Sequence, residues 1–159
     1  MRMWWVIFAM AITIACAGTA NAGDYRIVSI NKNQMTIVDP STIERAGSGL
    51  VRAWSVGLRA PGKELKGASV VKIRFEVDCG GRRARAIDSA FYDASYSFVT
   101  SNDTPSAAWM AVIPDSQGEA FHNFVCSPPS KRNDTAERLA GLTLAEIIRR
   151  IYAGPWPAN

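Results

Sequence analysis

The segment VKIRFEVDCGGRRARA, residues 71–86, carries the clearest folding signal in the sequence. From Val71 to Cys79, apolar residues hold every odd position and charged residues hold every even one. This two-residue period is typical of a β-strand with one buried and one solvated face. Gly80 and Gly81 follow, and a pair of glycines favours the two-residue turn of a hairpin. The sequence therefore predicts an antiparallel hairpin.

The turn also fixes which residues of the two arms face each other. Folding back around the glycines brings opposite charges together on the solvated face and apolar residues together on the buried one. The expected cross-strand pairs are Asp78–Arg83, Val77–Ala84, Glu76–Arg85 and Phe75–Ala86. Each pair contributes about 0.2–1 kcal/mol. Arg82 has no carboxylate opposite it, and we therefore take it as the candidate of this basic cluster for binding a partner.

Further strands are expected on both sides of the hairpin. The second arm continues from 87 to 92, and short apolar runs bounded by turn residues predict strands at 25–30, 35–38, 50–58 and 96–100. Asp39, Pro40 and Ser41 indicate a turn or a short helical start. Together these segments predict a small antiparallel sheet of about five or six strands.

Two loops are candidate binding elements, because loops on a rigid scaffold commonly carry function. The first, residues 60–67, is rich in Gly, Pro and Lys, and it supplies Lys63 and Lys66 as candidate partner-binding residues. The second loop comprises residues 101–108.

The period changes at Ser116, which has capping-box spacing to Glu119 and predicts the start of a helix. Cys126 closes this helix. His122 and Asn123 lie off its apolar face, and we therefore expect them toward solvent or a groove edge. The apolar face consists of Ala120, Phe121, Phe124 and Val125.

Residues 127–133 predict a polar linker, and a helical tail follows it. Two further pairs with cap spacing, Asp134 with Glu137 and Thr143 with Glu146, indicate helix starts. The tail is amphipathic, with Arg149 and Arg150 opposite an apolar stripe of Leu142, Ile147, Ile148 and Ile151. We expect it to pack on its own domain or on a second copy; the alternative is a helix that lies on a membrane surface or on another partner.

The first 22 residues have the pattern of a secretory signal peptide. A positive start is followed by an uncharged apolar run at 3–15, and Ala20 and Ala22 give the small-x-small site that a signal peptidase cuts. The mature protein is expected to begin at Gly23. The apolar run is shorter than the roughly 20 residues that span a bilayer, which argues against a membrane anchor.

Lipidation at Cys16 is the rival interpretation, and it is the one route by which we expect membrane attachment. Thr13 stands where lipidation signals usually carry Leu or another aliphatic residue, so cleavage after Ala22 is favoured.

Cleavage leaves Cys79 and Cys126 as an even pair in an exported chain, where oxidising conditions favour a disulfide. The spacing is not the C-x-x-C of redox-active pairs. Closing a loop of about 48 residues stabilises a fold by roughly 4 kcal/mol on the chain-entropy model. The bond would clamp the helix that ends at Cys126 onto the apolar side of the sheet.

Composition restricts the function classes. A chain of 159 residues with 48% apolar and 20% charged side chains predicts one compact domain rather than a multidomain enzyme or a disordered protein. The net charge of +4 is too low to indicate nucleic-acid binding. The chain has a single histidine, so a catalytic triad or a metal site would have to be built around His122.

An enzyme would need His122 to act with Asp115 or Glu119 and with Ser116 as the nucleophile. A turn and a helix cap explain those three neighbours better. We therefore expect no catalytic residues, no metal and no cofactor. Trp54, Trp109, Phe75, Phe121 and Phe124 are expected in the core.

Several segments, taken in order, resemble the surface-adhesin protein E family of Gram-negative bacteria. They are TIVDPSTIERAG at 36–47, VRAWSV at 51–56, KIRFEVDCGGRRAR at 72–85, AFYDA at 90–94 and AWMAVIPDSQGEAFHNFVC at 108–126. The resemblance spans roughly Arg26 to Cys126. It implies a small antiparallel sheet with a helix tethered across one face by a disulfide, and self-association into dimers. It also implies an exported, non-catalytic surface protein that holds host extracellular-matrix or serum proteins.

The sequence thus predicts an α+β fold in three parts: a cleaved signal peptide at 1–22, a protein E-like domain at 23–127, and a linker with a helical tail at 128–159. The expected function is an adhesin-like protein-binding module, located in the periplasm, on the outer surface or outside the cell. The alternative is an envelope housekeeping protein, such as a periplasmic inhibitor or assembly factor, with no host partner. Family membership determines the fold more closely than the partner.

Overall fold

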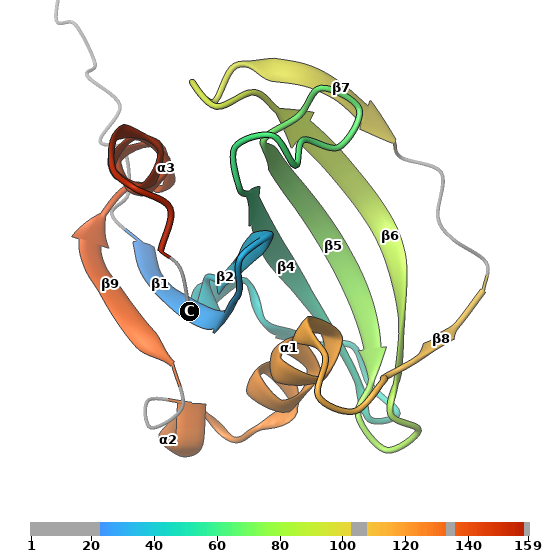
Figure 1. Ribbon diagram of the computed structural model, residues 1–159. Helices are drawn as coiled ribbons and strands as arrows, with labels where there is room; N and C mark the ends of the chain where they lie inside the picture. The colour runs from blue at the N-terminus through green and yellow to red at the C-terminus, as the bar shows by residue number, and fades with distance from the viewer. Residues whose placement is uncertain (1–22, 103–107, 133–135, 158–159) are drawn as a thin grey trace, which may run out of the picture.

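The computed structural model describes residues 23–102, 108–132 and 136–157. Within these ranges nine strands form one antiparallel sheet in the order β7-β6-β5-β4-β2-β1-β9, with β3 beside β4 and β8 beside β6 (Figure 1). The strands are β1 (Gly23–Ile30), β2 (Gln34–Val38), β3 (Glu44–Arg45), β4 (Leu50–Arg59), β5 (Val70–Asp78), β6 (Arg83–Tyr92), β7 (Phe98–Asn102), β8 (Met110–Ala111) and β9 (Glu137–Leu142). The antiparallel α+β class is confirmed. Five or six strands were too few, because β3 and β8 are too short to show a period and β9 replaces an expected helix.

The hairpin of β5 and β6 has the expected register. All four predicted cross-strand pairs, from Asp78–Arg83 to Phe75–Ala86, are present. A β-bulge between Arg74 and Phe75 then shifts the register, so that Arg74 pairs with Asp88. Alternation along one strand carries no signal for the extra residue that a bulge inserts on its partner.

The turn between β5 and β6 differs from the prediction. The last pair is Asp78–Arg83, so the connection has the four residues 79–82. Arg82 adopts the left-handed conformation, with φ of 46°, whereas both glycines have φ outside that region. Gly81 is needed for a different reason: a Cβ on it would lie 2.5 Å from Oδ2 of Asp78. Asp78 accepts a hydrogen bond from the Gly81 N–H at 2.8 Å and thereby closes the turn.

The helix α1 (Gln117–Cys126) packs across one face of the sheet, near the end of β5 (Figure 1). Ser116 caps it by accepting a hydrogen bond from the Glu119 N–H, but the Glu119 carboxylate accepts from the Asp115 N–H instead of completing the capping box. The predicted disulfide between Cys79 and Cys126 is present. The core beneath this helix consists of Val38, Val51, Ala53, Val77, Phe121, Phe124 and Val125. We call this face of the sheet the α1 face.

The helix α3 (Leu144–Ala153) packs on the opposite face, toward the other end of the sheet. Alternation along the strands places its partners on the side away from α1, which we call the α3 face. Thr143 and Glu146 form the predicted capping box. Near the end of the helix, the Tyr152 hydroxyl lies 2.8 Å from the carbonyl oxygens of Arg59 and Ser69. This second core consists of Met35, Ile37, Val56, Leu58, Val70, Leu144, Ile147 and Ile148.

The segment before α3 is a strand and not the helix expected from Asp134 and Glu137. Asp134 lies outside the described residues, and Glu137 begins β9, which pairs with β1. Leu139 and Leu142 of β9 pack against the α3 core, and this packing outweighs the helical preference of the segment. The expected linker at 127–133 also contains a short helix, α2 (Pro129–Arg132).

Three expectations about burial were wrong. Trp54 and Trp109 are only half-buried, because both lie on the part of the α3 face that α3 does not cover. His122, expected toward solvent, is 4% exposed. Phe121 and Phe124 are buried as expected, and Phe75 is half-buried with its ring 5.3 Å from that of Phe121.

The expected signal peptide, with Cys16, Ala20 and Ala22, lies outside the described residues, and Gly23 is the first residue of β1. No helix in the described ranges is both long and apolar enough to cross a membrane.

Candidate functional site

The uncovered part of the α3 face is a ladder of arginines and carboxylates flanked by two tryptophans. We call it the arginine–tryptophan face; it consists of Glu44, Arg52, Trp54, Lys72, Arg74, Glu76, Asp78, Arg83, Arg85 and Trp109. Charged side chains lie here because the even positions of β4 and β5 point away from α1. At the far end of the same face α3 packs over apolar residues, so the change from apolar to charged occurs along single strands.

Glu76 is the centre of this ladder. Its carboxylate is bracketed by Arg52, which donates through Nε and Nη2 at 3.0 and 2.8 Å to one oxygen, and by Arg85, which donates to the other. The hydrogen bonds from Arg52 lower the pKa of Glu76 below its usual value, and Arg85 adds to this effect against the opposing effect of burial. Glu76 is 2% exposed, whereas the Arg52 side chain remains 44% exposed. The ladder is therefore a rigid ionic scaffold whose cations still reach solvent.

Both tryptophans are stacked against cations. The Trp109 ring centroid lies 5.0 Å from Cζ of Arg83 and 4.8 Å from Cζ of Arg85. Lys72 Nζ lies 5.5 Å from the Trp54 ring centroid, and burial lowers the pKa of this lysine. Such stacking holds large aromatic surfaces in fixed positions. Arginine and tryptophan are also the residue types enriched at the energetic centres of protein interfaces.

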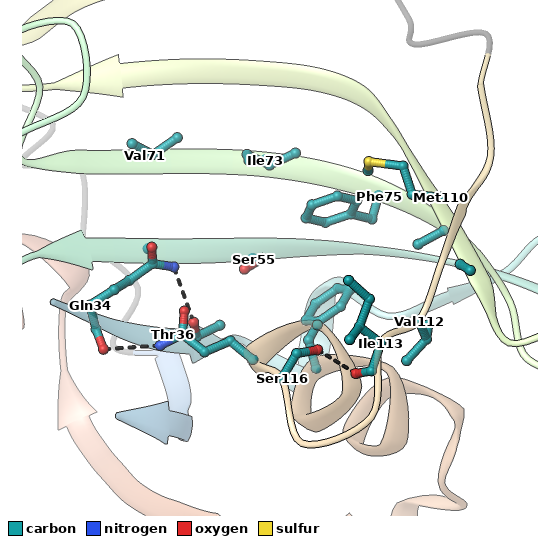
Figure 2. Close-up of a pocket in the computed structure, with 16 residues that line it drawn as sticks. Gln34, Thr36, Ser55, Val71, Ile73, Phe75, Met110, Val112, Ile113 and Ser116 are labelled. Carbon is teal, nitrogen blue, oxygen red and sulfur yellow. Dashed lines mark hydrogen bonds between the residues drawn. The ribbon is translucent and has the colours of Figure 1, made fainter. Parts of the chain in front are cut away.

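A pocket opens on the α1 face, beside the first turn of α1 (Figure 2). It has a volume of about 370 Å³. Its floor is formed by β4, β5 and β6, one side by the strap of residues 110–113, and the other side by Gln34 and Thr36 of β2. The strap is held by pairing of β8 with β6 and by the Val112 N–H, which donates to the carbonyl of Arg82. The remaining wall is the first turn of α1, from Ser116 to Gly118, together with Phe121.

The residues proposed from the sequence for partner binding do not come together as one site. Lys63 and Lys66 lie exposed in the loop at 60–67, and Lys66 Nζ lies 6.0 Å from the Phe91 ring centroid. Arg82 lies at the opposite end of the sheet, in the turn before β6. No residue of β5 pairs with Arg82 across the hairpin, as expected, but Arg82 forms an ion pair with Glu119 of α1 that the sequence did not indicate. A role for these three residues in binding stays a prediction. The second candidate loop lies outside the described residues at positions 103–107.

The groups considered for catalysis have structural roles. Ser116 caps α1 as the sequence indicated, whereas the Glu119 carboxylate accepts a hydrogen bond from the Asp115 N–H. His122 is buried, with Nδ1 3.3 Å from the Asn123 side-chain oxygen and Nε2 without a hydrogen-bond partner among the described residues. The described part of the chain contains no group of three or more His, Cys, Asp or Glu side chains placed to hold a metal ion.

Sequence reasoning missed both surfaces described above. The pocket had a weak signal: Ser55 and Gly57 put small residues on the α1 face of β4, opposite the larger Val56 and Leu58. Trp54 also had a weak signal. It shares its side of β4 with the charged residue Arg52, which indicates the solvated side of the strand. The strap has no signal of its own, because β8 is two residues long.

Comparison with known proteins gives one family match. The family described as surface-adhesin protein E matches residues 25–127. No curated protein matches the chain. Among solved structures, crystal form II of Haemophilus influenzae protein E is similar at 16% identity and a TM-score of 0.49, covering 73% of this chain and 96% of that one. Protein E from non-typeable Haemophilus influenzae is similar at 15% identity and a TM-score of 0.43, covering 72% and 82%.

Proposed function

The chain belongs to the surface-adhesin protein E family, and on that premise we propose that it is an exported, non-catalytic module that holds host extracellular-matrix or serum proteins at the cell surface. The observation that carries the proposal is the extent of the match, residues 25–127, which includes both the arginine–tryptophan face and the disulfide-tethered helix α1. We further propose that residues 1–22 are removed on export, that residues 23–127 form the family domain, and that residues 128–159 are an appended tail.

The arginine–tryptophan face is our proposed contact surface. Its side chains are held in place by the ion pairs around Glu76, so little conformational entropy is lost when a partner docks on it. Arg52 and Arg83 have side chains 44% and 50% exposed, and Trp109 offers a large apolar ring beside them. Basic side chains outnumber acidic ones on this face, which favours an acidic partner surface.

The experiment is a binding assay with the mature chain beginning at Gly23. Human serum proteins and solubilised matrix proteins are immobilised separately, and binding is measured by interferometry. We expect specific binding that weakens at least tenfold in Trp109→Ala and in Arg74→Ala. Arg149→Ala is the control, because Arg149 is an exposed arginine that lies on α3 and outside this face. Absence of binding above background to every protein tested would contradict adhesion.

Location separates this proposal from a housekeeping role. Surface labelling of intact cells should modify exposed lysines such as Lys63. Release of unlabelled protein by osmotic shock would instead support a periplasmic inhibitor or assembly factor. An unchanged affinity in Trp109→Ala, with host binding otherwise intact, would move the contact to another surface without removing the adhesin function.

A further inference from the structure

The pocket on the α1 face is a built hollow and not a gap between elements. It exists because the floor side chains are small at Ser55, Gly57 and Ala84, which lie on either side of Val71, Ile73 and Phe75 of the central strand β5 (Figure 2). At Gly57 a Cβ would lie 3.2 Å from Nε2 of Gln34, so a larger residue would both narrow the floor and disturb its rim. Its volume of about 370 Å³ lies within the range of small-molecule pockets.

The lining of the pocket is neutral. Its described lining contains no charged side chain, although the other face of the same strands carries the arginine–tryptophan face. Branched aliphatic side chains and the rings of Phe75 and Phe121 make up most of its surface. A charged group buried here would lack a counter-ion and would pay its full desolvation cost. The part of a ligand that enters is therefore uncharged and apolar.

The rim indicates that the pocket is open to an occupant. Met110 and Ile113 of the strap are 53% and 68% exposed, although both line the pocket. An inserted apolar group would bury part of both side chains, and a methionine adapts its shape to different occupants.

The pocket crosses several strands of the sheet. Its lining residues come from four neighbouring strands, β6, β5, β4 and β2. Three strand spacings make the distance across them about 15 Å. An alkyl chain can cross the strands over this distance and leave its polar end at the mouth.

We propose that this pocket binds the alkyl chain of a single-chain amphiphile, with the head group outside in solvent. The inference stands apart from the proposed adhesin function, because the pocket lies on the opposite face of the sheet from the arginine–tryptophan face. Loss of either activity in a variant therefore leaves the other to be measured.

The first test titrates the mature chain with sodium salts of hexanoate, octanoate, decanoate and dodecanoate below their micelle concentrations, followed by methyl and amide NMR. We expect shifts concentrated at Val71, Ile73 and Ile113. The dissociation constant should fall about fourfold for each added methylene until the chain outgrows the pocket. Shifts spread over the surface, or no shift with decanoate, would overturn the proposal.

The second test changes the head group. Decyltrimethylammonium has the same chain with the opposite charge, and because the lining is neutral we expect it to bind within about threefold of decanoate. If only one of the two binds, the site recognises the charge of the head group and the proposal is wrong.

The third test fills the pocket. Gly118 is exposed on its wall, and a Cβ there meets Ser116 Oγ only at 3.4 Å, so Gly118→Leu should fold normally and weaken decanoate binding at least tenfold. Ala84→Leu fills the pocket from its floor. It serves as a second test in case the leucine at position 118 does not point into the pocket. Ala140→Leu on β9 is the matched control and should bind as the unmodified chain does. Unchanged binding in both pocket variants would overturn the proposal.

The remaining occupant to be tested is a second copy of the chain. Sedimentation of the unmodified chain and of Gly118→Leu decides this. If the unmodified chain dimerises, Gly118→Leu does not, and decanoate produces no shifts, the pocket is a dimer contact and the proposal is wrong. If decanoate binds and Gly118→Leu leaves the oligomeric state unchanged, the alkyl site is supported.

Discussion

The two faces of the sheet are each half covered, but by different means and at opposite ends. On the α1 face the helix covers the end near the β5–β6 turn and leaves an apolar hollow at the other end. On the α3 face the helix covers that other end and leaves the arginine–tryptophan face near the turn. A single sheet thus presents one neutral and one charged surface. This difference shows that the positions of the two helices determine which side chains of the sheet stay exposed.

The two helices are also attached differently. The α1 helix is bonded covalently to the sheet through Cys79 and Cys126, and Arg82 reaches it by an ion pair. The α3 helix has no such link; it depends on its buried isoleucines, its capping box and the Tyr152 hydroxyl. Variants of the two attachments therefore test whether α1 and α3 contribute equally to the free energy of unfolding.

Replacing Cys79 and Cys126 together by serine should have the largest effect. The sequence separation of 47 implies a loss of roughly 4 kcal/mol in the free energy of unfolding on the chain-entropy model. Urea unfolding of the double variant measures it. A loss below about 1 kcal/mol would show that packing holds α1 without the bond and would end the contrast between the helices.

Ile148→Ala should come next, with a loss of about 3 kcal/mol, because Ile148 is 1% exposed and its removal leaves a cavity under α3. Thermal and urea unfolding measure the change. Arg149→Ala, its exposed neighbour on the same helix, should stay within about 0.5 kcal/mol of the unmodified chain. Equal effects in the two variants would mean that α3 does not pack as described.

Glu76→Gln tests the charged half of the comparison. We expect a loss of about 2 kcal/mol near neutral pH, discounted from the value for a fully buried pair because both arginines reach solvent. The folded-state pKa of Glu76 is lowered, chiefly by Arg52, so its stabilisation is present above the unfolded value near 4.5 and is lost as pH falls below it. The stability difference between the two proteins should therefore shrink below about pH 4. A constant difference from pH 7 to 3 would contradict this account.

Arg82→Ala should have the smallest effect, about 0.5 kcal/mol, because half of its side chain is exposed and exposed ion pairs contribute little. Urea unfolding at low and at high salt measures it, and the effect should vanish at high salt. A loss larger than that of Glu76→Gln would show that Arg82, and not the disulfide alone, fixes α1.

The parts of the fold that followed from the sequence are those with local signals. The charge alternation of Lys72, Arg74 and Glu76 determined one strand, and its match to Arg85 determined the next. The spacing of Thr143 and Glu146 gave the start of α3, because a cap involves residues three apart. The cysteine pair followed from counting.

The parts that failed depend on distant contacts. His122 looked exposed because it lies off the helix's apolar stripe, but α1 is enclosed on more than one side and is not a simple surface helix. Glu137 looked like a helix cap, but its segment pairs with a strand more than a hundred residues earlier. Trp54 was expected in the core, but its strand places it on the charged half of the α3 face. The pocket depends on how the first turn of α1 is placed over the sheet, and no sequence period encodes that placement.

The pairing of β1 with β9 has a consequence for how the protein is made. Arg138 donates a hydrogen bond to Asp24 across a separation of 114 residues. The outer edge of β1 can therefore pair only after β9 has been synthesised. Contacts of such high order slow folding. Until β9 arrives, the edge of β1 stays unpaired, and unpaired edges promote aggregation. The edge of β1 is therefore the part of the sheet that is covered last.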